Sequence, residues 1–229
     1  MRRSLLAGPI PSLVGVGIVI LLAIAVSLDL TDALDRSIID VVRSDALAGL
    51  LSPLRWITEL GSSAAVTGVA VATVIVALAI GPWRHGVAGA MTIGLASLGN
   101  QAFKAFVARA RPDLLEPVIV ERGFSFPSGH AALSMVAHGV LGVILARSIR
   151  PGRVQRALII TLGLTIFLVG LSRVWLGVHY PSDVVAGWTA GAVIVLVFAR
   201  LTRSVSLEPI SEAVDGDRAA PRSDPPGLG

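Results

Sequence analysis

Long apolar stretches separated by short polar connections dominate the chain. Six of them are long enough, or nearly so, to cross a bilayer as helices, which takes about 20 residues. They lie at roughly Ile10–Leu28, Ala64–Ile80, Gly86–Val107, Gly129–Ala146, Ala157–Leu171 and Val184–Ala199. The fifth apolar run is short, and we expect its helix to continue to Leu176, which places Arg173 inside the bundle. The pattern predicts an all-α polytopic membrane protein with a six-transmembrane-helix bundle.

The segment Asp29–Leu51, between the first two spans, is amphipathic. Its apolar residues recur every four positions: Leu30, Leu34, Ile38, Val42, Ala46 and Leu50. This spacing favours an outer helix that lies in the membrane interface or caps the bundle. We therefore divide the chain into an N-terminus (1–9), a six-helix membrane domain (10–203) and a tail (204–229). The tail holds Pro, Gly, Asp and Arg without periodicity, which predicts disorder.

Composition supports the membrane assignment. Hydrophobic residues make up 54% of the chain and charged residues only 15%, against about 25% in soluble domains. A soluble protein of this size cannot hide that much apolar surface, because a large share of its residues must face water. A disordered, collagen-like or nucleic-acid-binding chain is excluded for the same reason. There is no cysteine, so disulfides, thiolate metal sites and thiol nucleophiles are excluded as well.

The net charge of +4 comes from arginines that cluster between spans. Seven of them fall in connections that six spans would place on one side: Arg84, Arg147, Arg150, Arg153, Arg156, Arg200 and Arg203. The positive-inside rule makes that side cytoplasmic, so both termini are expected in the cytoplasm and the protein in the plasma membrane. The connections 29–63, 108–128 and 177–183 then face outward. Residues 23–25 resemble a signal-peptidase site, although the long apolar run favours a retained anchor.

Ionisable groups at membrane depth need a partner or a function, and three clusters of them lie near the outward ends of helices. The first cluster contains Lys104 and Arg111, followed by Pro112. In a helix that ends near Pro112, a spacing of seven puts these two cations on one face, with Arg109 pointing away as an interfacial charge. Two cations on one face suit a bound anion. The alternative is a pair of side chains that snorkel to the interface.

The second cluster is Pro127-Ser128-Gly129-His130, which opens the fourth span. Ser128 can cap that helix, and Gly129 allows a ligand to approach the backbone closely. The N–H groups at a helix start form an anion site, and His130 can donate a proton. Ser and Gly at a helix start also need no function, so this cluster is weak evidence alone.

The third cluster, between the fifth and sixth spans, contains Ser172-Arg173, His179 and Asp183. His179 and Asp183 are four residues apart and can meet where the chain is helical. A carboxylate bonded to one imidazole nitrogen fixes the tautomer and makes the other nitrogen a better nucleophile. A purely structural His–Asp pair is an equal alternative for this cluster taken alone.

Together the clusters supply cations, a helix-start anion site and two histidines on one face of the membrane. Arginine matches phosphate oxygens with its forked donors, and lysine adds a point charge. The motifs hold no carboxylate cluster for a metal ion, so neither a metal nor another cofactor is expected. The combination predicts phosphoryl transfer through a histidine.

The motifs Lys-x6-Arg-Pro, Pro-Ser-Gly-His and Ser-Arg-x5-His-x3-Asp, in this order over residues 104–183, resemble the signature of the type-2 phosphatidic acid phosphatase superfamily. The resemblance implies a metal-independent membrane lipid phosphatase. His179 would form a phosphohistidine, oriented by Asp183, and His130 would act as general acid and then as base. The phosphate-binding residues would be Lys104, Arg111, Ser128, Gly129 and Arg173.

A site at the outer interface suits a lipid phosphate whose tails remain in the bilayer. We expect a phosphate monoester or diphosphate such as polyprenyl diphosphate, phosphatidic acid or phosphatidylglycerol phosphate. Two alternatives stay open: a lipid phosphotransferase that uses the same phosphoenzyme, and a non-enzymatic membrane protein whose charges bind an anion or are structural. The sequence does not fix the oligomeric state, and no nucleic-acid partner is expected.

Overall fold

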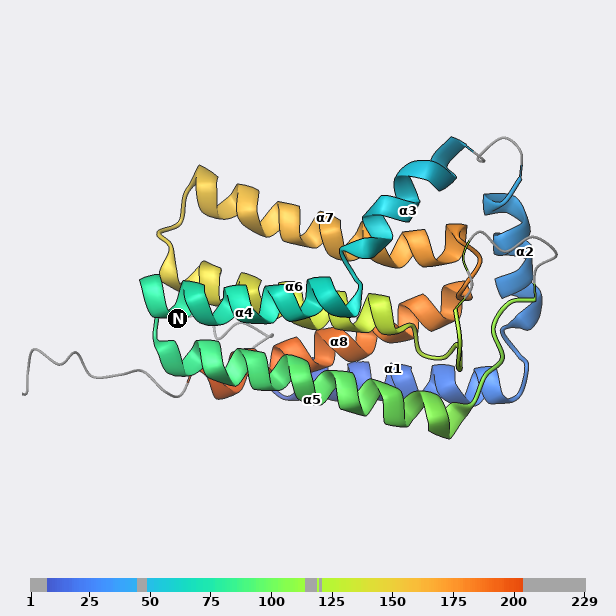
Figure 1. Cartoon of the computed structure of the whole chain (residues 1–229). Coiled ribbons are helices and arrows are strands. Elements are labelled where there is room, and N and C mark those ends of the chain that lie inside the picture. The colour runs from blue at the N-terminus through green and yellow to red at the C-terminus, as the bar shows by residue number, and fades with distance from the viewer. Residues whose placement is uncertain (1–7, 45–48, 114–118, 120, 204–229) are drawn as a thin grey trace, which may run out of the picture.

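The computed structural model describes residues 8–44, 49–113, 119 and 121–203, so the predicted tail and most of the N-terminus lie outside the described residues. Over the described residues the chain forms α-helices and no strand. In chain order these are α1 (Ile10–Ser27), α2 (Asp32–Val42), α3 (Leu51–Glu59), α4 (Ser63–Ile80), α5 (Trp83–Val107), α6 (Gly129–Ser148), α7 (Arg153–Trp175) and α8 (Pro181–Leu201). The long helices run alongside one another, and α2 and α3 lie at one end of the bundle (Figure 1).

Among the residues that the structure describes, five helices are long and apolar enough to cross a membrane: α1, α4, α6, α7 and α8. Their outer faces keep large apolar side chains exposed, as at Ile75 and Leu164, which are both more than half exposed. Such surfaces suit lipid, and the chain is a multi-span membrane protein. The 25-residue α5 lies beside α4 (Figure 1) but carries polar residues such as Asn100 and Lys104, and its role as the sixth span stays a prediction.

Helix α6 occupies the centre of the bundle, where it contacts α4, α5, α7 and α8. The largest buried apolar cluster joins α4, α5, α6 and α8. It consists of Val66, Ala77, Ile93, Ala96, Val136, Ala137, Val140, Ile144 and Phe198. The part of α6 that follows the second motif, from Val136 to Ile144, is therefore anchored in a packed core.

Two glycines of α8 set the close packing of α6 against α8. A Cβ at Gly187 would lie 2.7 Å from the carbonyl oxygen of Ser128, and one at Gly191 would lie 2.8 Å from that of Ala132. Small residues allow two membrane helices to approach at backbone distance. The Ser128 N–H also donates to the Asp183 carbonyl at 3.0 Å. The second and third motifs are thus held side by side at the starts of these two helices.

Two helix ends test the predictions around the motifs. Helix α7 continues past Leu171 to Trp175 and buries Arg173, as expected. Helix α5, however, ends at Val107, and the left-handed Ala108 (φ 53°) turns the chain away. The prediction of a helix that runs nearly to Pro112 is therefore wrong. Proline restricts only the residue before it, whereas a left-handed residue ended the helix earlier.

Candidate active site

A cavity of about 370 Å³ opens at the end of the bundle where α6 begins. Five of the eight predicted site residues line it: Lys104, Arg111, Gly129, His130 and His179. Three do not: Ser128, Arg173 and Asp183 are buried behind its wall with 0%, 1% and 0% exposure. Asn100 and Glu121, which the sequence did not single out, also line the cavity. The structure therefore gathers all three motifs around one pocket.

His179 lies in the connection between α7 and α8, with its two ring nitrogens in different surroundings. Nε2 lies 3.2 Å from Arg111 Nη1. A guanidinium only donates hydrogen bonds, so Nε2 must accept and carry the lone pair. Nδ1 then bears the hydrogen and faces Asp183 Oδ2 at 3.4 Å. Burial lowers the pKa of His179 to about 4, although Asp183 opposes the shift, so the imidazole is uncharged at neutral pH.

Ser125 lies between the histidine and the aspartate. Its Oγ donates a short hydrogen bond to Asp183 Oδ2 and lies 3.3 Å from His179 Nδ1. Asp183 Oδ2 also accepts from the Tyr180 N–H at 2.9 Å. The expected His179–Asp183 pair therefore exists, but its direct contact is long and a serine bridges it. Ser125 was missed because it lies three residues before Ser128 in a loop, where no helical spacing links it to Asp183.

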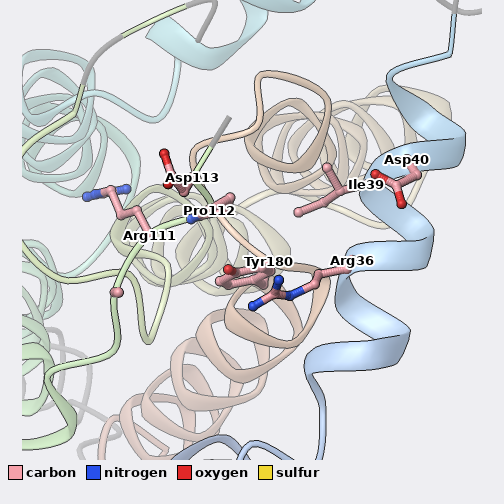
Figure 2. Close-up of a pocket in the computed structure, with 8 residues that line it drawn as sticks. Arg36, Ile39, Asp40, Arg111, Pro112, Asp113 and Tyr180 are labelled. Carbon is pink, nitrogen blue, oxygen red and sulfur yellow. The ribbon is translucent and has the colours of Figure 1, made fainter. Parts of the chain in front are cut away.

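Arg111 and Lys104 lie on the cavity wall although they do not share a helix. Arg111 donates to the carbonyls of Val178 and Gly123, at 2.8 and 3.1 Å. Lys104 Nζ donates to the Phe124 carbonyl at 2.7 Å. These contacts fix both cations against the loop that precedes α6. Arg111 also lines a second cavity, which separates its segment from α2 (Figure 2).

Arg173 is held from two sides. Its Nη1 donates to Thr58 Oγ1 of α3 at 2.6 Å, and its Nη2 forms a close ion pair with Glu121. Glu121 also pairs with Arg111 at 3.1 Å, so one carboxylate bridges two predicted phosphate ligands. In the described part of the chain, neither Arg173 Nε nor Ser128 Oγ has a hydrogen-bond partner. Ser128 occupies the N-cap of α6 without capping it through its side chain.

Arg109 is not an interfacial charge that points away, as the sequence suggested. Its side chain is only 8% exposed, and its Nη1 lies 2.7 Å from Asp183 Oδ1. Its Nη2 pairs with Asp32 and Asp35 of α2 at 3.0 and 2.9 Å. The prediction from helical spacing is wrong for Arg109, because α5 ends before this residue.

The donor set suits an anion. Among the described residues no group of three or more His, Asp or Glu side chains is arranged to hold a metal ion. Apart from Glu121, the charged side chains that line the cavity are the cations Lys104, Arg111 and Arg122, and cationic N–H donors bind phosphate oxygens. A histidine lone pair at the same wall adds a nucleophile to this anion site.

The model of the PAP2 superfamily matches residues 85–205, just over half of the chain and all three motifs. The chain belongs to the PAP2 superfamily. It is 34% identical over 102 residues to Phosphatidylglycerophosphatase B of Bacillus subtilis, covering 44% of this chain and 50% of that protein. It is 37% identical over 79 residues to Undecaprenyl-diphosphatase of Sulfolobus acidocaldarius, covering 34% of this chain and 33% of that protein. The alignments therefore span half or less of these relatives.

Solved structures agree with this family assignment. The chain superposes on a transmembrane PAP2-type phosphatidylglycerolphosphate phosphatase of Bacillus subtilis with a TM-score of 0.78 and 25% identity. That match covers 85% of this chain and 97% of the other. LpxE of Aquifex aeolicus matches with a TM-score of 0.57 and 22% identity over 72% of this chain and 94% of its own, and it supports the fold alone.

Proposed function

We propose that the protein is an integral membrane phosphatase that hydrolyses a phosphate monoester or diphosphate of a lipid, without a metal ion, through a phosphohistidine on His179. The observation that carries this proposal is the 3.2 Å contact between His179 Nε2 and Arg111 Nη1 on the cavity wall, from which we infer that the lone pair is on Nε2. The names of the PAP2 relatives, a phosphatidylglycerophosphatase and an undecaprenyl-diphosphatase, support the substrate class.

In the first step Arg111 Nη1 leaves His179 Nε2 for a phosphoryl oxygen, and Nε2 forms a bond to phosphorus while the bond from phosphorus to the leaving oxygen of the lipid breaks. His130, on the same cavity wall, gives a proton to the departing oxygen. In the second step His130 takes a proton from water, which attacks phosphorus and breaks the P–N bond. Inorganic phosphate leaves and His179 is regenerated. Asp183 orients the ring and stabilises the charge that develops on it.

Lys104, Arg111, Arg173, Ser128 Oγ and the Gly129 N–H are the proposed ligands of the phosphoryl oxygens. Lys104, Arg111 and Gly129 line the cavity, and donors held there would stabilise the charge that shifts onto these oxygens in the transition state. Arg173 reaches the phosphoryl group where the Glu121 carboxylate now bridges it to Arg111. The substrate would therefore displace Glu121 and take over its two ion pairs.

We further propose that α5 is the sixth membrane span and that residues 10–203 form the membrane domain. Residues 1–9 and the tail 204–229 would then be cytoplasmic, with the protein in the plasma membrane. The segment around α2 would be the amphipathic outer segment, and the cavity would face the extracytoplasmic side. The support is that the cavity and α2 lie at the end of the bundle opposite the arginine-rich connections (Figure 1).

An apolar groove beside the cavity supports a lipid substrate. It has a volume of about 300 Å³ between α5, α6 and α8, and it shares Asn100 and Leu133 with the cavity. The rest of its lining is small or apolar: Ala96, Gly99, Phe103, Pro127, Ala132, Val136, Ala190, Gly191 and Ile194. A lipid chain can leave the phosphate site through this groove and remain between helices.

Gly99→Leu tests the groove. A Cβ at Gly99 meets no atom within 4 Å, so leucine fills the groove without a backbone clash. We expect kcat/KM to fall about tenfold or more for a long-chain lipid phosphate, because the loss of even one methylene contact in an apolar pocket is worth about 1–3 kcal/mol. Turnover of a short-chain, water-soluble phosphate ester should stay unchanged. Gly94→Leu is the matched control, because Gly94 lies on the same helix in open space and lines neither cavity. Equal losses of kcat/KM in both variants would contradict the proposal that this groove holds the lipid chain.

The decisive experiment measures phosphate release by the purified protein in detergent, with EDTA present. The substrates are a polyprenyl diphosphate, phosphatidic acid and phosphatidylglycerol phosphate. Free inorganic phosphate supports hydrolysis, whereas a new phospholipid supports transfer to another acceptor. Strong inhibition by EDTA would contradict the metal-free mechanism. Failure to turn over any substrate would favour a non-enzymatic anion-binding protein.

A further inference from the structure

Arg109 joins the outer helix α2 to the start of α8, and the three signature motifs assign it no role. One end of its fork, Nη1, donates to Ser182 Oγ at 2.8 Å and to Asp183 Oδ1 at 2.7 Å. The other end, Nη2, donates to Thr31 Oγ1, Asp32 Oδ1 and Asp35 Oδ2 at 2.9–3.1 Å. The guanidinium also lies over the Tyr180 ring, 4.0 Å from its centroid. The two ends of this arginine therefore bind two different helices.

Asp35 completes the link from the side of α2. Its side chain is 3% exposed, although the sequence pattern places it among the polar positions of an outer helix. Its Oδ1 accepts from the Ser182 N–H at 2.9 Å, and its Oδ2 accepts from Ser182 Oγ at 2.6 Å. A carboxylate of α2 thus satisfies one of the free N–H groups at the start of α8. The residue it holds is the neighbour of Asp183.

The consequence for Asp183 is that its two oxygens are divided between two tasks. Oδ1 is held by Arg109, while Oδ2 accepts from Ser125, from the Tyr180 N–H and from the ring of His179. Arg109 on one oxygen, and Ser125 with the Tyr180 N–H on the other, together hold the carboxylate rotamer in which Oδ2 faces His179. A carboxylate with no exposure also needs a counter-ion to stay ionised, and Arg109 supplies it.

We propose that Arg109, clamped by Asp35, is a positioning residue for the Asp183–His179 pair, and that α2 is through this contact part of the active-site machinery. The inference rests on the proposed function, since it concerns the same histidine. Figure 2 shows where α2 lies: its residues Arg36, Ile39 and Asp40 line a cavity of about 470 Å³ together with Tyr180 and the segment Arg111–Asp113.

The first test compares Arg109→Gln, Arg109→Lys and Asp35→Asn in the phosphate-release assay with the full-length protein. We expect kcat to fall about 10- to 100-fold in Arg109→Gln, the range that coupled contacts usually give, with KM nearly unchanged. Arg109→Lys should recover part of the loss, because lysine restores a positive charge beside Asp183 but not the forked donors of the guanidinium. Asp35→Asn should lie between wild type and Arg109→Gln. Ser37→Ala is the control, because Ser37 is exposed on the same helix as Asp35 and its hydroxyl donates to the Leu34 carbonyl of that helix.

The second test separates positioning from a merely structural role. If Arg109 acts through Asp183, Arg109→Gln should cost little further activity in an Asp183→Asn background, so the two losses will not multiply. The inference would be overturned if the losses in Arg109→Gln and Asp183→Asn multiply, or if Arg109→Gln and Ser37→Ala have equal effects. If Arg109→Gln does not fold, Asp35→Asn alone and combined with Asp183→Asn provides the same comparison. A wild type that releases no phosphate refutes the proposed function and this inference with it. An active wild type beside an unaffected Arg109→Gln refutes the inference alone.

Discussion

Replacing His179 with alanine is expected to abolish phosphate release while the protein still folds and inserts. The substitution removes the Nε2 lone pair that lies beside Arg111 on the cavity wall, and no other described side chain presents a histidine nitrogen backed by a carboxylate. The loss of a nucleophile in a hydrolase that works through a covalent intermediate reaches about 10⁴-fold or more. Initial rates with saturating lipid phosphate in detergent measure it.

His85→Ala is the matched control for this prediction. His85 lies near the start of α5, at the end of the bundle opposite the cavity (Figure 1), and its removal should leave turnover unchanged. Quenching a reaction with labelled substrate in alkali, where phosphohistidine survives, should trap label on the wild type and none on His179→Ala. Turnover that persists in His179→Ala would remove the covalent mechanism, even if the substrate class is correct.

The sequence predicts those parts of the site that local spacing determines. His179 and Asp183 are four positions apart, and their side chains approach because α8 begins between them. Gly129 and His130 line the cavity because they open α6. Helix periodicity and helix ends are local properties of the chain, so one sequence is enough to find them.

The parts that the sequence does not predict depend on contacts between distant segments. Asp35 meets Ser182 across 147 positions, and Thr58 meets Arg173 across 115. No periodic pattern connects such pairs, because they follow from how whole helices pack. The left-handed Ala108 had the same effect over a short range: it ended α5 early and turned Arg109 toward Asp183.

Arg173→Lys is expected to lower kcat/KM by about 10²- to 10³-fold, the cost of one preorganised donor in a transition state. Lysine keeps the positive charge but loses the planar fork, so the variant tests geometry rather than charge. Water cannot replace the lost donor, because Arg173 is only 1% exposed. Arg84→Lys is the control. Arg84 is exposed at the start of α5, at the end of this helix away from Lys104, and the variant should retain wild-type kinetics.

The Arg173 variant also tells whether Glu121 and phosphate compete for one place. If they do, inhibition by inorganic phosphate should weaken in Arg173→Lys, which loses a ligand, and strengthen in Glu121→Gln, which loses the competing carboxylate. We expect the inhibition constant to move by about tenfold in each direction, or 1.4 kcal/mol. Opposite signs cannot arise from general loss of structure, because damage to the fold would weaken inhibition in both variants. Unchanged phosphate inhibition in both would make the Arg173–Glu121 pair a structural contact and move the phosphoryl group toward Lys104 and Arg111.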